Sequence, residues 1–353
     1  MKLFTCGACG APQHFEATAC DACGKRLGFA AGRRALLALD LDETLWRPAE
    51  RQRASADEAY VFCANAAYGA CNWLVPAQEA GAERFCLACR HNRTIPDLAL
   101  GDHIARWRKL EEAKKRLVYT LVALDLPLTR RPEDPNGLAF DFLADPPDAA
   151  PVTTGHTQGL VTIALAEADD VEREARRHAM GEPYRTLLGH LRHEVGHYYF
   201  EKIVVERDAI EAFRTLFGDE RTDYAAALAR HYEAGPPADW AERHVSAYAS
   251  AHPWEDWAET FAHYLHMVDT LETAAAFGLS LSPQEPGAED LAARVAFDPH
   301  DDGAFGRLVA AWGPLTFAVN ALNRSMGQGD LYPFALPPPA VEKLAFVHAR
   351  VRR

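Results

Sequence analysis

Residues 190–200 read HLRHEVGHYYF and contain the pattern HExxH, formed by His193, Glu194 and His197 with two uncharged residues between the last two. Side chains four residues apart lie on the same face of an α-helix. The two imidazoles can therefore bind one metal ion, with the carboxylate of Glu194 beside it. The sequence predicts a helix over 183–206, with Pro183 in its first turn, that carries this site.

A catalytic zinc ion needs a third protein ligand and one open position. The residues that follow the HExxH pattern lack a further histidine at metal-ligand spacing, so we expect the third ligand from a distant segment. The stretch HPWEDWAETFAHYLHM (252–267) predicts a helix over 253–277. We predict Glu259 as the third ligand, because the small residues Ala258 and Ala262 beside it allow a metal centre to approach. The rival ligands are Glu255, Asp256 and His263.

All eight cysteines lie within the first 89 residues, in two sets of four. Four thiolates suit the tetrahedral coordination of zinc, and such a closed site leaves no position for catalysis. We therefore predict two structural zinc sites. The first set has the spacing CxxC, ten residues, CxxC, and consists of Cys6, Cys9, Cys20 and Cys23. The second set is less regular and consists of Cys63, Cys71, Cys86 and Cys89.

Net charge and hydropathy argue against nucleic-acid-binding, membrane-spanning and secreted proteins. The net charge of the 353 residues is −13, and the excess of acidic residues lies after residue 116. An acidic main body argues against nucleic acid as a partner. No apolar run approaches the roughly 18–20 residues of a membrane span, and the first residues lack the pattern of a secretory signal. We expect a cytoplasmic protein that does not bind membranes, in which cysteines stay reduced.

The stretch LLALDLDETLW (36–46) resembles the first motif of haloacid-dehalogenase-type phosphatases. In that reading Asp40 is the nucleophile and Asp42 the acid/base. A lone motif is weak without its structural context. Cys63 begins another small metal site soon afterwards, and no alternation of strands and helices follows. We therefore interpret the stretch as a strand and a turn.

Secondary-structure signals place three regions along the chain. We predict an N-terminal zinc ribbon over 1–34, a second four-cysteine module over 35–96 and a main domain over 97–353. The fold class is α+β and mainly helical. The main domain is predicted to contain a loop over 127–158, a strand over 159–169, and helices over 97–124, 207–234, 303–323 and 340–352.

Several motifs together carry a family resemblance. The two cysteine sets, LRHEVGHYYF, HPWEDWAETFAHYLHM and ALNRSMGQGDLYPF (321–334) resemble the bacterial zinc-ribbon-containing zinc metallopeptidases. Within them, ETFAHY (259–264) resembles the surroundings of the third ligand in glutamate-zincins. The resemblance implies a zincin-like main domain with a strand, 159–169, at the edge of its sheet.

The resemblance and the HExxH pattern lead to one expected function. We expect a zinc peptidase that hydrolyses peptide bonds with a zinc-activated water and Glu194 as general base. Tyr248 and His252 are candidates to stabilise the oxyanion. We expect one catalytic and two structural zinc ions, a peptide or protein substrate, and a possible protein partner for the ribbons. The alternative is a non-catalytic zinc-binding interaction protein.

Overall fold

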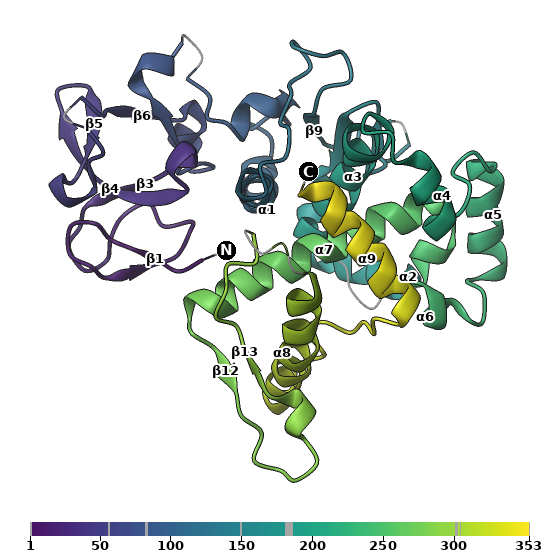
Figure 1. Ribbon diagram of the computed structural model, residues 1–353. Helices are drawn as coiled ribbons and strands as arrows, with labels where there is room; N and C mark the ends of the chain where they lie inside the picture. The colour runs from purple at the N-terminus through teal and green to yellow at the C-terminus, as the bar shows by residue number, and fades with distance from the viewer. Residues whose placement is uncertain are drawn as a thin grey trace. The chain divides into compact units, whose positions relative to one another are not determined.

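The chain folds into two compact units, 1–173 and 174–353 (Figure 1). The computed structural model describes residues 2–55, 57–81, 84–148, 150–180, 186–300, 303 and 305–352. Helices account for 46% of the structure and strands for 15%, so the prediction of a mainly helical α+β protein is confirmed. Helix α2, Asp170–Met180, runs across the division between the units. Within the described residues, no helix is both long and apolar enough to cross a membrane.

An antiparallel sheet of five strands organises the first part of the N-terminal unit. Its strands follow one another in chain order, each paired with the next. They are β3 Arg26–Ala30, β4 Ala35–Asp42, β5 Leu45–Pro48, β6 Tyr60–Phe62 and β7 Leu74–Pro76. A separate two-stranded ribbon consists of β1 Phe4–Thr5 and β2 Pro12–Gln13. Because Ala30 pairs with Ala35 across the predicted boundary at residue 34, the two cysteine-bearing regions share a sheet rather than forming separate modules.

An aromatic cluster joins the same two regions. The ring of Phe15 lies 4.9 Å from that of Phe29 and 5.4 Å from that of Tyr119, measured between centroids. Phe29 also contacts Trp73, at 4.8 Å. This core includes cysteines of both sets, so the packing around one set depends on the other.

The DLDET stretch lies at the end of β4. Asp40 forms an ion pair with Lys25, and Asp42 pairs with Arg47 at 2.6 Å; both carboxylates are at least half exposed. Strand β4 is antiparallel to both of its neighbours. A phosphatase of the haloacid-dehalogenase type requires a doubly wound parallel sheet at this motif, so the structure is incompatible with that reading.

A second sheet occupies the rest of the N-terminal unit, together with helix α1, His103–Ala123. Its order is β10-β11-β9-β8. The strands are β8 Asn92–Thr94, β9 Ala139–Leu143, β10 Gly155–Thr157 and β11 Leu160–Ala164. Strands β9 and β10 lie within the predicted loop 127–158, which was therefore only partly correct.

The strand predicted over 159–169 is β11, but it is not an edge strand. It pairs with β10 on one side and with β9 on the other. Gln158 and Gly159, both with positive φ (47° and 76°), form the two-residue turn that brings β10 back onto β11. The expectation that this strand presents a free edge is therefore wrong.

The C-terminal unit is built from helices. They are α3 Leu187–Phe200, α4 Ile210–Phe217, α5 Tyr224–Ala234, α6 Trp240–Arg243, α7 Pro253–Ala276, α8 Phe305–Ser325 and α9 Pro338–Val351. A short hairpin, β12 Ser280–Leu281 with β13 Ala293–Arg294, precedes α8. The single helix predicted over 207–234 is divided into α4 and α5, because Gly218 adopts a φ of +102° that ends α4. Pro183 lies outside the described residues.

Helix α7 is the central element of this unit and packs against α3, α4, α8 and α9. Its contact with α3 is close at Gly196, where a Cβ atom would lie 3.0 Å from Cα of Ala258. The indole of Trp257 donates a hydrogen bond of 2.8 Å to the carbonyl of Gly196. These contacts fix the register between the HExxH helix and the helix that supplies the acidic residues.

Candidate metal centres

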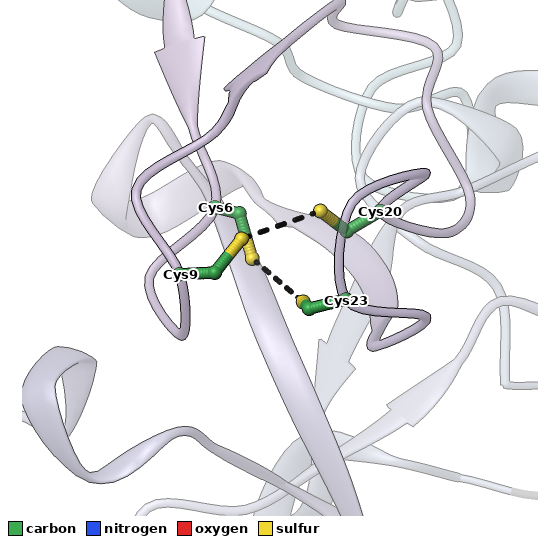
Figure 2. Close-up of side chains that lie close together, drawn as sticks. All are labelled: Cys6, Cys9, Cys20 and Cys23. Carbon is green, nitrogen blue, oxygen red and sulfur yellow. Dashed lines mark hydrogen bonds between the residues drawn. The ribbon is translucent and has the colours of Figure 1, made fainter.

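The first cysteine set forms two similar turns (Figure 2). The backbone N–H of Gly10 donates to the carbonyl of Cys6 at 2.7 Å, and Gly24 donates to Cys20 in the same way at 2.8 Å. Both glycines have left-handed backbones, with φ of +81° and +73°. Only glycine adopts this conformation without strain. These two glycines therefore allow the chain to turn tightly around the site.

The sulfur positions of this set fit a zinc ion. The Sγ atoms of Cys6 and Cys23 are 3.7 Å apart, and those of Cys9 and Cys20 are 3.6 Å apart. Two sulfurs on a tetrahedral zinc ion, each bonded at about 2.3 Å, are separated by roughly 3.8 Å. All four thiols are free, and one sulfur of each CxxC turn faces a sulfur of the other.

The second set is more deeply buried. All four of its cysteines are buried and free, and their sulfurs lie within 4.8 Å of one another. Three backbone N–H groups point at these sulfurs, from Trp73 to Cys71 at 3.4 Å, from Cys86 to Cys63 at 3.5 Å and from Cys89 to Cys86 at 3.5 Å. Such donors stabilise thiolates and orient metal ligands. The irregular spacing in the sequence therefore still produces a four-sulfur cluster.

The HExxH residues lie on α3 as predicted. Thr186 caps this helix, accepting a 3.0 Å hydrogen bond from the N–H of Gly189. The rings of His193 and His197 are neighbours, with centroids 4.9 Å apart. His197 is buried, and Trp254 covers its ring at a centroid distance of 3.9 Å.

The carboxylate that meets both histidines belongs to Glu255. Its Oε2 lies 3.0 Å from Nε2 of His193 and its Oε1 lies 3.6 Å from Nε2 of His197. One possible ligand atom from each of these three residues lies within 4.8 Å of the other two. Two imidazole nitrogens and one carboxylate oxygen are a common donor set for catalytic zinc, so the residues fit the ion that the HExxH pattern implies.

Glu259 lies on the other edge of the same ring. Its Oε1 is 2.7 Å from Nδ1 of His193, and Ser246 donates to its Oε2 at 2.7 Å. Nδ1 of His193 contacts this carboxylate, whereas Nε2 of the same ring faces Glu255. The geometry therefore departs from the expected choice of Glu259 as the third ligand, because one turn of α7 separates the two glutamates and only Glu255 reaches both Nε2 atoms.

The other rivals have different partners. Asp256 is buried and accepts a 2.6 Å hydrogen bond from Lys343. His263 contacts the hydroxyl of Tyr332 through Nδ1, at 2.7 Å. Neither residue belongs to the group around His193 and His197.

Burial and mutual contacts change the acidity of this cluster. Burial would raise the pKa of Glu255, but His197 and His193 nearby lower it to about 2. The pKa of Glu259 is also about 2, because the contact with His193 outweighs the effect of burial. Burial raises the pKa of Glu194 to about 7; the charge of His193 opposes this rise, and those of Glu255 and Glu259 add to it.

The two expected oxyanion candidates have different surroundings. The ring of Tyr248 lies 5.8 Å from that of His193, centroid to centroid, which keeps it beside the cluster. His252 instead caps α7. Its Nδ1 accepts from the N–H of Trp254 at 3.1 Å, and its Nε2 contacts the hydroxyl of Thr222 at 3.0 Å. Because both ring nitrogens have partners there, the expectation that His252 faces the reaction centre does not fit the structure.

Tyr224 is a neighbour of the site that the sequence analysis missed. Its hydroxyl donates a 2.8 Å hydrogen bond to Oε1 of Glu255. It is the first residue of α5, which Asp223 caps. Burial raises the pKa of Tyr224, and the charge of Glu255 adds to the rise. No local pattern distinguishes this tyrosine, because its role depends on how α5 packs near the start of α7.

Comparison with known families matches residues 103–350 to the family described as "Putative zinc-binding metallo-peptidase". The match covers both α3 and α7. The chain belongs to this metallopeptidase family. Residues 3–100 match a zinc-ribbon domain family. The predicted family is thereby confirmed, and zinc is the metal that both matches and the two four-cysteine clusters support.

Relatives of this metallopeptidase-family chain are found in mycobacteria. An uncharacterised protein of Mycobacterium bovis is 44% identical over 354 residues, which cover 99% of this chain and 95% of the relative. An uncharacterised protein of Mycobacterium tuberculosis has the same identity and coverage. No solved structure matches the chain.

Proposed function

We propose that the protein is a zinc-dependent peptidase whose reaction centre is formed by His193, His197, Glu255 and Glu194. The observation that carries the proposal is the position of Glu255, whose two oxygens meet the Nε2 atoms of both histidines. Glu194 is adjacent to the first histidine and is nine-tenths buried, as a catalytic carboxylate in a water-poor site is. Membership of the metallopeptidase family supports the same reaction class.

In this proposal Glu255 is the third zinc ligand and Glu259 is a positioning residue. A metal-ligating histidine commonly donates its second ring N–H to a carboxylate, which fixes the ring and its tautomer. The contact between Glu259 and Nδ1 of His193 has this form. Tyr224 holds Glu255 in the equivalent way, through the hydroxyl that donates to Oε1.

Glu194 performs the proton transfers of the proposed reaction. Zinc, when bound, polarises the scissile carbonyl and makes water acidic enough to act as a nucleophile near neutral pH. Glu194 accepts the proton from the attacking water and returns it to the leaving amine. Tyr248, beside His193, is the proposed donor to the developing oxyanion. The substrate is a peptide or a protein, and the four-cysteine clusters are structural.

The competing function is a zinc-binding interaction protein without catalysis. A metal site of that kind needs the two histidines and Glu255 but has no use for a buried carboxylate at position 194. Glu194 does not belong to the ligand group, and keeping it buried is costly without a role. This cost favours the peptidase.

The experiment compares wild type with Glu194→Gln on a peptide library derived from a proteome. The wild-type protein should make cuts that the variant does not, while both bind the same amount of zinc. Glu211→Gln, which changes an exposed carboxylate on α4, is the control and should cut like wild type. Equal cutting by wild type and Glu194→Gln would contradict the mechanism, and an absence of cuts by wild type would favour the interaction protein.

A further inference from the structure

A further cluster of metal-ligand side chains, separate from the cysteine sets, lies along α7 beyond the proposed reaction centre. Asp269 and Glu272 are one helical turn apart, and His300 comes from the segment that precedes α8. One ligand atom from each lies within 4.8 Å of the others, and all three residues are buried. Asp269 is 14 residues beyond Glu255, which is about 21 Å along a helix. The cluster is therefore distinct from the proposed reaction centre.

His300 is the residue that points to a ligand. Its side chain is fully buried, and neither ring nitrogen has a hydrogen-bond partner among the described residues. Burying an imidazole without hydrogen bonds is costly. A bound cation would supply the missing interaction, because a neutral imidazole nitrogen is a strong ligand of divalent metals.

Carboxylate oxygens lie near both ring nitrogens of His300. Nε2 lies 3.8 Å from Oδ1 of Asp269, and Nδ1 lies 3.6 Å from Oε1 of Glu272 and 3.4 Å from Oδ1 of Asp298. These distances are longer than those of good hydrogen bonds, whose N–O separation is about 2.7–3.2 Å. An imidazole binds a given ion through one nitrogen only, and one ring nitrogen of His300 lies within 4.8 Å of an oxygen of Asp269 and of an oxygen of Glu272. Two ligand atoms bonded to one tetrahedral zinc ion are separated by roughly 3.4 Å, so the three side chains would move closer together around the ion.

Other contacts hold the cluster in place. The N–H of His300 donates to Oδ1 of Asp298 at 2.9 Å, and Arg352 donates to the carbonyl of Pro299. Arg192 of α3 forms an ion pair with Oδ2 of Asp269 on α7, whereas Oδ1 of this carboxylate faces His300. The ligand atoms are therefore presented by fixed elements.

We propose that Asp269, Glu272 and His300 bind a zinc ion that fastens the segment before α8 to helix α7. One nitrogen and two carboxylate oxygens are ligands that zinc accepts. The ion ties residues that are far apart in the sequence, so its role is structural. Binding to the folded state alone stabilises that state. This site does not depend on the peptidase proposal.

The test counts zinc bound to the full chain after loading and dialysis, by mass spectrometry of the metal. His300→Gln and Glu272→Gln should each bind one zinc fewer than wild type and melt at a lower temperature. Glu255→Gln, on the same helix, is the matched control; it removes a ligand of the proposed reaction centre only. The double variant Glu255→Gln/His300→Gln should bind two fewer. An unchanged count in both His300→Gln and Glu272→Gln would overturn the proposal.

A measurement on unsubstituted protein avoids the risk that a variant fails to fold. Cadmium-113 spectra of the cadmium-loaded chain separate ions bound by sulfur from ions bound by nitrogen and oxygen. We expect two signals of the second kind, one of which is lost in Glu255→Gln. A single such signal that Glu255→Gln abolishes would overturn the second site while leaving the peptidase intact. A signal that persists in Glu255→Gln supports the second site, whatever the outcome for the peptidase.

Discussion

Nδ1 of His193 lies 2.7 Å from Oε1 of Glu259. The opposite edge of the same ring faces Glu255, whose Oε2 is 3.0 Å from Nε2. One imidazole is thus held between two carboxylates that come from successive turns of α7. Only one of its nitrogens can bind the ion shared with His197, so the two glutamates must have different roles.

The first prediction separates these roles. Glu255→Gln removes a charged ligand and should abolish zinc binding at this site at micromolar zinc, because two histidines leave the ion short of its preferred coordination. Glu259→Gln should still bind zinc, with an affinity lower by about 10–100-fold, the usual effect of losing a partner of a ligand. Competition with a chromophoric chelator measures both affinities. The reverse order of the two variants would restore Glu259 as the ligand.

The second prediction concerns the contact between α3 and α7. Gly196→Ala should destabilise the protein by about 1–3 kcal/mol, because the added methyl group meets the backbone of Ala258 at 3.0 Å. Gly306→Ala is the control, since nothing lies within 4 Å of a Cβ atom there. Alanine loses less conformational entropy than glycine when a helix forms. Gly306→Ala should therefore leave the free energy of unfolding unchanged or raise it by up to about 1 kcal/mol. Denaturant unfolding compares the two, and equal stabilities would refute the close approach.

The helices and cluster members that could be predicted follow from local patterns. HExxH spacing places His193 and His197 on one face of a helix, and this is independent of how the helix packs. Pro253 marks the start of α7 because proline is favoured in the first turn. The sequence could not choose between Glu255 and Glu259, since both lie on the same face. The choice depends on the axial register of α7 against α3, which the tertiary contact at Gly196 determines.

The structure also differs from the sequence-based expectations at His252 and in residues 127–158. His252 precedes the proline that opens α7, which is the position of a helix cap, yet its side chain was interpreted as catalytic. Residues 127–158 are rich in Pro, Asp and Gly, which indicates turns but does not exclude the short strands between them. Strand β9 forms there because it pairs with β11 on one side and β8 on the other, and such pairing is not local.

The third prediction tests the role of His252. His252→Ala should lower the free energy of unfolding by about 0.5–2 kcal/mol, the usual cost of losing a helix cap. His252→Asn should keep most of the stability, because asparagine is a favourable cap residue. Both variants should retain zinc at His193 and His197 and, where folded, cut peptides at the wild-type rate. A stable, zinc-loaded His252→Asn protein that no longer cuts would instead assign His252 to catalysis.

The last prediction concerns the two four-cysteine clusters. Cys9→Ser and Cys86→Ser should each bind one zinc fewer per chain, since each removes one of four thiolates. Zinc contributes roughly 10–16 kcal/mol to the folding of small zinc-finger peptides, so both variants should be cleaved more readily by added protease within the first 100 residues.

The two variants should differ in stability, because Cys9 is exposed and Cys86 is buried. Cys86→Ser also buries a hydroxyl group, at a cost of about 1–3 kcal/mol, and should be the less stable of the two. Zinc counts and protease-resistant fragments, identified by mass spectrometry, provide the measurement. An unchanged zinc count in either variant would show that its cysteine is not a ligand. Equal stability of the two variants would mean that burial of the second four-cysteine cluster does not increase the loss of stability on substitution.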